Sequence, residues 1–126
     1  MQPDSGYGER EMASYKLVVF SDSTEDGNEG EYNDWYTNQH LADVVDVPGF
    51  VSAQRFKIKT LVMGEFKNKY MAIYNIESDD PQKVMDAMMA RRGTDQMVIS
   101  EALDTDNCDC ALFETISQEV MAPANA

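Results

Sequence analysis

Apolar residues recur along this chain with two periods, which predict alternating strands and helices. Four runs rich in β-branched and aromatic residues have strand length. Of two helix-length segments, one stops at Pro48-Gly49, and the other begins at Asp80-Pro81 and ends at Gly93. The expected strands are Tyr15–Ser21, Phe50–Ile58, Lys69–Glu77 and Cys108–Ile116, the first expected helix is Glu31–Val47, and a short helix is expected around Met97–Leu103.

The order β-α-β-β-α-β predicts an α+β fold of the ferredoxin-like type, with a four-stranded antiparallel sheet and both helices on one face. A chain of 126 residues is long enough for one domain with a hydrophobic core and too short for two. We expect this domain to span residues 14–117. Residues 1–13 and 118–126 lack periodicity and are expected to be a flexible lead-in and tail.

Both faces of the predicted sheet are largely apolar. On the first strand, for example, Leu17 and Val19 alternate with Val18 and Phe20. A solvated sheet face should alternate apolar and polar residues, and two helices can cover only one face. We therefore expect a second copy of the chain to cover the other face, forming a homodimer by a two-fold interface.

The composition narrows the possible partners. The formal net charge is −13, with 23 acidic and 10 basic residues, so nucleic acid and acidic membrane surfaces are disfavoured. No membrane span or signal peptide is evident, and we expect a cytoplasmic protein with a small-molecule ligand. Cys108 and Cys110 are interpreted as small buried apolar residues, since two thiols make a poor metal site.

The first predicted helix holds the one histidine, His40, and the one tryptophan, Trp35. At about 100° per residue, Tyr36, His40, Val44 and Val47 fall on one apolar stripe, whereas Trp35 falls among polar positions. A neutral imidazole in an apolar wall could transfer a proton, and burial would lower its pKa. His40 as an acid/base and His40 as a core residue bonded to a backbone carbonyl both remain open.

Five further residues are candidates for binding a substrate. They are Tyr36, Trp35, Tyr74, Arg55 and Asn38. Arg55 could bind a carboxylate or enolate oxygen, although an ion pair with an acidic side chain is favoured. Tyr74 could reach the cavity or simply pack, Asn38 could orient a carbonyl despite its polar wheel position, and Trp35 is expected mainly to pack.

The segment Asp34–Leu41 carries a Trp35-Tyr36 pair followed by His40-Leu41, and Pro48-Gly49 then turns into the second strand. These residues resemble the EthD-like family of the dimeric α+β barrel superfamily. The resemblance implies homodimers with sheets packed face to face, a cavity between helices and sheet in each subunit, and His40 as the acid/base. The family usually has a proline soon after His-Leu, whereas Ala42 and Asp43 follow here, so the helix should continue unbroken.

We therefore expect a cofactor-independent enzyme of the lyase, isomerase or cyclase type. Its substrate would be an aromatic, lactone or polyketide-like carbonyl compound, with His40 as general acid/base. No cofactor or metal is expected. Two alternatives stay open: a non-catalytic binding or accessory protein for a hydrophobic metabolite, and a cofactor-free or haem-dependent oxygenase relative.

Overall fold

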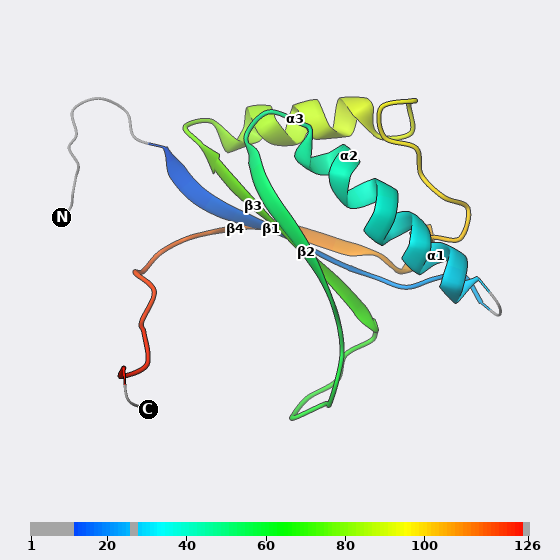
Figure 1. Cartoon of the computed structure of the whole chain (residues 1–126), viewed down its shortest axis with the longest axis horizontal. Coiled ribbons are helices and arrows are strands. Elements are labelled where there is room, and N and C mark those ends of the chain that lie inside the picture. Colours follow the sequence, from blue (N-terminus) through cyan, green and yellow to red (C-terminus); the bar gives the residue numbers. More distant parts are fainter. Residues whose placement is uncertain (1–11, 26–27, 125–126) are drawn as a thin grey trace.

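The computed structural model describes residues 12–25 and 28–124. Four antiparallel strands form one sheet in the order β2-β3-β1-β4, and the helices lie on one side of it (Figure 1). This is the predicted α+β, ferredoxin-like arrangement. The elements are β1 (Ala13–Ser21), α1 (Glu29–Trp35), η1 (Tyr36–His40), α2 (Leu41–Val45), β2 (Phe50–Lys57), β3 (Tyr70–Ser78), α3 (Pro81–Arg91), η2 (Thr105–Asn107) and β4 (Asp109–Glu114).

Elements α1, η1 and α2 form one continuous helical segment, as predicted, but its middle is a π-helical turn. There the N–H of Leu41 donates to the carbonyl of Tyr36, five residues back. A π turn takes in one extra residue and so rotates the following helix relative to the preceding one. Trp35 is buried, at 8% exposure, three residues after the buried Tyr32. Its predicted place among the polar positions was wrong, because the indole packs against Tyr36 and His40.

The predicted turn at Pro48-Gly49 and the predicted start of α3 are both confirmed. Gly49 has a φ of +106°, and a Cβ there would lie 2.6 Å from a methyl group of Val84. Only glycine fits both conditions without strain. Val84 belongs to α3, and Asp80 caps the N-terminus of this helix: its side chain accepts a hydrogen bond from the N–H of Lys83 at 3.1 Å.

The predicted short helix at residues 97–103 is not present. The segment is held instead by partners distant in sequence: the indole N–H of Trp35 donates to the carbonyl of Val98, and the N–H of Thr24 donates to the carbonyl of Ala102. Bonds to other elements thus replace a local helical ladder. Met97 and Leu103 are buried and complete the core on this side.

The side of the sheet without helices is called the open face here. Its residues, from neighbouring positions of the four strands, are Lys16, Val18, Phe20, Gln54, Phe56, Met71, Ile73, Asn75, Ala111 and Phe113. Phe56 is 39% exposed and Phe113 is 55% exposed. The loop between β2 and β3 and the C-terminal residues also expose apolar side chains, and both extend away from the sheet in Figure 1.

Of the predicted terminal segments, residues 1–11 lie outside the described part of the chain. Residues 115–124 have no regular secondary structure and are exposed. Within the described ranges, no helix has both the length and the apolar character that crossing a membrane requires.

Candidate functional site

A cavity of about 230 Å³ lies between the helical layer and the sheet. β1, β3 and β4 form its floor, η1, α2 and α3 form its walls, and the segment from Met97 to Leu103 closes one end. Most of the lining is apolar. The exceptions are Ser21, Tyr36, His40, Tyr74, Arg92, Cys108 and Cys110. The structure therefore brings three of the predicted site residues, His40, Tyr36 and Tyr74, together at one cavity.

The π turn places the His40 ring against the indole of Trp35, five residues earlier. The two rings are stacked, with centroids 4.5 Å apart and planes 24° apart. Tyr36 meets the imidazole edge-on at 4.9 Å. In the regular α-helix assumed from the sequence, residues five apart would not face each other in this way.

The imidazole of His40 is neutral at pH 7 and has an unused nitrogen. Burial, with smaller contributions from the positive charges of Arg92 and Arg55, lowers the pKa of His40 to about 4. Its Nδ1 atom is buried and has no hydrogen-bond partner among the described residues. A core histidine would be expected to bond that nitrogen to a backbone group. No such bond is formed here.

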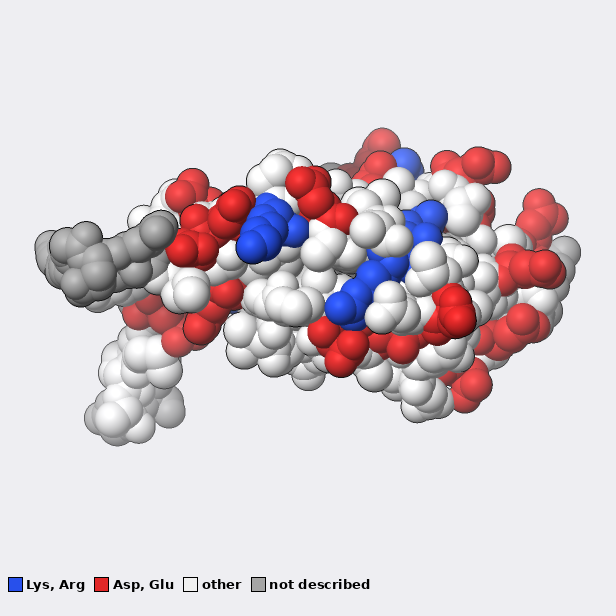
Figure 2. Space-filling model, turned by 90° about the horizontal axis from the view of Figure 1, so that it is seen from above, with Lys and Arg blue, Asp and Glu red and all other residues white. Residues whose placement is uncertain are grey.

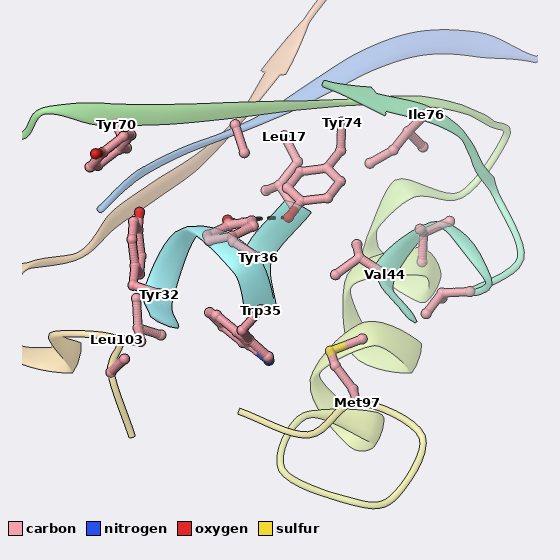
Figure 3. Packing of buried hydrophobic residues seen from close by; sticks show 14 residues of the cluster. Leu17, Tyr32, Trp35, Tyr36, Val44, Tyr70, Tyr74, Ile76, Met97 and Leu103 are labelled. Carbon is pink, nitrogen blue, oxygen red and sulfur yellow. Dashed lines mark hydrogen bonds between the residues drawn. The ribbon is translucent and has the colours of Figure 1, made fainter. Parts of the chain in front are cut away.

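Beside His40, the phenol of Tyr74 donates a hydrogen bond to the Tyr36 hydroxyl at 3.2 Å (Figure 3). Tyr74 extends from the sheet and Tyr36 from the helix, so the bond joins the two layers. Burial raises the pKa of both phenols well above the ordinary value, and both stay protonated at neutral pH. Tyr36 has no acceptor for its own hydroxyl proton among the described residues, so it can donate to a ligand.

Arg55 lies next to the cavity rather than on its lining. Its guanidinium carbon is 4.5–5.2 Å from the ring centroids of Tyr32, Tyr36 and Tyr70, and Nη1 donates to the Thr37 hydroxyl at 2.9 Å. The ion pair favoured from the sequence was wrong, because the described residues place aromatic rings, not a carboxylate, around this cation. By contacting Tyr36 and Thr37, Arg55 supports the π turn that carries His40.

The remaining two predicted residues do not line the cavity. Asn38 is exposed, and its side-chain amide donates to Asp34 at 2.8 Å on the outer surface of the helix. Trp35 lies behind His40, and its N–H is bonded to the carbonyl of Val98 at 3.0 Å. In this arrangement Trp35 can fix the imidazole but does not reach the cavity.

Two cysteines and one arginine line the cavity without having been predicted to do so. Cys108 is half-buried and Cys110 exposed, so the prediction that both are buried was wrong. Desolvation raises the pKa of both thiols, which are protonated at neutral pH. Their spacing was a clue to this position, because residues two apart on a strand point to the same face of the sheet. Nothing in the sequence distinguished Arg92.

A larger, open hollow of about 630 Å³ lies between the β2–β3 loop and the start of α1. Its polar groups bond mainly to one another: Asp22 accepts from Asn68 and from the N–H of Lys69, and Lys69 pairs with Glu29 at 3.2 Å. Several polar groups of this open hollow are thus already engaged with one another rather than free for a ligand. Within residues 12–25 and 28–124, no cluster of three or more His, Cys, Asp or Glu side chains could hold a metal ion.

Two solved structures share this fold. One is an ethyl tert-butyl ether D (EthD) family protein from Bacillus halodurans C-125, with a TM-score of 0.57 and 23% identity, covering 82% of this chain and 99% of its own. Another is a candidate monooxygenase from Shewanella loihica PV-4, with a TM-score of 0.54 and 16% identity, covering 85% and 98%. The EthD-like fold predicted from residues 34–51 is thereby confirmed.

A more distant match is the monooxygenase from the gene ActVA-Orf6 of Streptomyces coelicolor, in complex with nanaomycin D. It has a TM-score of 0.39 and 9% identity, covering 91% of this chain and 97% of its own. No family model matches the sequence, and no curated protein matches it. At these identities the likeness concerns the fold, and the reaction must be argued from the cavity itself.

Proposed function

We propose that this protein is a cofactor-independent acid/base enzyme that acts on a small cyclic carbonyl compound held in the 230 Å³ cavity. The observation that carries the proposal is the neutral His40 imidazole on the apolar lining of the cavity, which burial keeps unprotonated and which no described residue binds by a hydrogen bond. An unused basic nitrogen beside a hydroxyl donor is what proton abstraction next to a carbonyl requires.

In the proposed step His40 removes a proton from a carbon adjacent to the substrate carbonyl. The C–H bond breaks, its electron pair forms an enolate, and the proton passes to the imidazole. The Tyr36 hydroxyl donates to the carbonyl oxygen as negative charge develops there. The imidazolium then returns the proton, either to another position of the enolate or to the alkoxide formed when the enolate adds to a second carbonyl. The first outcome is an isomerisation, and the second is a ring closure.

The low pKa of His40, about 4, restricts the substrates that this base can deprotonate. A base works best when its pKa lies near the operating pH, and His40 lies well below it. The proton removed must therefore be unusually acidic, as it is on a carbon between two carbonyls or in a ring that becomes aromatic. The cavity is also smaller than the ~300–1,000 Å³ typical of drug-sized ligands, which favours a compound of one or two rings.

We further propose that two copies pair through the open face. The side chains at the centre of the open face are apolar, and Phe113 at its edge is 55% exposed. A contiguous exposed apolar surface of this kind is typical of a protein–protein interface. The β2–β3 loop, which extends away from the sheet, also exposes apolar side chains, including Val62 and Met63 at 87% and 80% exposure. A second sheet packed at about 10 Å would bury this surface.

The direct test is deuterium uptake at the acidic carbon of one- and two-ring ketones, 1,3-diketones and lactones in D₂O, followed by NMR. Wild-type protein should accelerate exchange for at least one compound, and His40→Gln should lose about 10²–10⁴-fold. Asn38→Ala is the matched control, because Asn38 lies on the outer surface of the same turn. Equal exchange by wild type and His40→Gln would refute the mechanism.

A binding protein without catalysis is the second candidate, and the mostly apolar lining favours it. Such a protein would bind members of the same panel and leave their exchange rates unchanged. Binding and exchange measured on the same samples separate the two functions.

A further inference from the structure

Basic side chains are scarce in this acidic protein, which has 10 Lys and Arg residues against 23 Asp and Glu. Figure 2 shows one face on which acidic side chains greatly outnumber basic ones. Within residues 12–25 and 28–124 the structure gives the ion pairs Lys67–Asp109, Lys69–Glu29 and Arg91–Asp46. Arg92 differs from these three, because among the described residues no carboxylate lies within ion-pairing distance of it. Among the described residues Arg55 and several lysines also lack an ion pair, so what sets Arg92 apart is its place on the lining of the cavity.

Arg92 lies at the C-terminal end of α3, where it lines the same cavity as His40. Gly93, with a φ of +84°, turns the chain away immediately afterwards. The guanidinium is close enough to lower the pKa of His40 on one wall and to oppose the rise in pKa of Cys108 and Cys110 on the floor. It is thus the one charged side chain on the cavity lining, and its charge acts across the cavity.

We infer that Arg92 binds an anionic oxygen of the ligand, so the cavity selects a ring compound that carries a carboxylate, or a hydroxyl that ionises on binding. The inference rests on the proposed function only in placing the ligand in this cavity. The other polar groups on the lining, including the Tyr36–Tyr74 pair and the neutral imidazole, have no charge to oppose a ligand anion. Arg92 is exposed to solvent as well as on the lining, and a charge-assisted hydrogen bond from its guanidinium to an anionic oxygen is stronger than one between neutral groups.

The net charge of −13 does not contradict an anionic ligand. At physiological ionic strength the screening length is about 8 Å, so distant carboxylates contribute little at the cavity. The nearest charge on the lining is positive. The overall acidity instead slows the approach of anions, and the local arginine decides which bound compounds stay.

Equilibrium dialysis of two matched probe pairs against the full chain tests the inference. The first pair is 2-naphthoate and its uncharged isostere 2-naphthamide. The second is 7-hydroxycoumarin and 7-methoxycoumarin, where the absorbance of the bound hydroxy compound reports its ionisation. The first pair tests whether the cavity prefers a carboxylate, and the second whether it prefers an ionised hydroxyl. None of the four compounds has to be a substrate.

Wild-type protein should bind the anionic member of at least one pair about tenfold more tightly than the neutral member, which corresponds to about 1.4 kcal/mol. Arg92→Gln should abolish that preference, and Arg92→Lys should retain part of it. Arg91→Gln is the control: it removes the same charge from the adjacent position, where the side chain pairs with Asp46 outside the cavity. It should leave the preference unchanged.

Equal binding within both pairs, or a preference that survives in Arg92→Gln, would overturn the inference. So would loss of the preference in Arg91→Gln to the same extent. These results are independent of turnover. If His40→Gln leaves exchange unchanged while the Arg92 preference holds, the proposed reaction is wrong and the anion site stands.

Discussion

Lowering the pH from 7.5 to 5.5 should destabilise the folded protein by about 1.4 kcal/mol through His40 alone. The pKa of His40 is about 4 in the folded chain, against a reference value of 6.5. Because the folded value is the lower one, the unfolded chain binds the proton first as the pH falls. Stability is therefore full above about pH 6.5 and declines until the pH reaches about 4.

The size of the effect follows from the gap between the two pKa values. Each pKa unit corresponds to about 1.4 kcal/mol, so the full loss is roughly 3 kcal/mol. At pH 5.5, one unit below the reference value, about 1.4 kcal/mol of this loss has occurred. The source is desolvation of the imidazole between Trp35 and the cavity, reinforced by the Arg92 and Arg55 charges.

The assay has two parts. The single histidine gives one imidazole signal in NMR, and its chemical shift should stay constant from pH 8 to about 5.5 in the folded protein. Urea unfolding at pH 7.5 and 5.5 should then show a loss of stability in wild type that exceeds the loss in His40→Gln by about 1.4 kcal/mol. Carboxylates that titrate between these pH values change the stability of both proteins equally, so their contribution cancels in this difference.

Two results would refute the reasoning. An NMR midpoint at 6.5 or above would mean that the imidazole is solvated or paired with an acid, contrary to its buried, unpartnered Nδ1. Identical pH dependence of wild type and His40→Gln would mean that His40 titrates alike in the folded and unfolded chains.

Three other predictions test the fold and the pairing. Gly49→Ala should cost about 1–3 kcal/mol in urea unfolding, because the new Cβ would lie 2.6 Å from Val84 as well as at positive φ. Gly64→Ala has a similar φ but open space around it and should cost less; equal losses would contradict the packing argument. Tyr74→Phe should cost about 1–2 kcal/mol, because it leaves a buried partner hydroxyl without its donor, and an unchanged midpoint in urea would count against that bond. Phe113→Lys should shift the protein from dimer to monomer in sedimentation equilibrium, and a wild type that already sediments as a monomer would remove the case for pairing.

The strand and helix order was predictable from the sequence because it depends on local patterns. Alternating apolar residues set the strands, and the Asp80-Pro81 start and Gly93 stop set α3, whose capping bond the structure contains. Strand ends differ from expectation by one or two residues, as hydrogen-bond pairing with a neighbour decides where a strand stops. The segment 97–103 was mispredicted for the same reason: its partners, Trp35 and Thr24, are far away in sequence.

The candidate site was only partly predictable. His40, Tyr36 and Tyr74 meet at the cavity because the first two share a helix face and the third points from the helix side of β3. The surroundings of Arg55 required tyrosines from two different elements to be placed in space, which no spacing rule supplies. The role of Arg92 depends on where α3 ends relative to the cavity, and that in turn depends on tertiary packing.

The π turn explains why the site has its particular chemistry. A regular helix through residues 36–40 would orient Trp35 and His40 differently, and the imidazole would lose its stacking partner. With the turn in place, the indole N–H is fixed to the Val98 carbonyl and the imidazole lies flat against the indole. The stacked indole covers one face of the imidazole while leaving the ring on the cavity lining. The stacking that helps to desolvate His40 is therefore a consequence of a local departure from the α-helix.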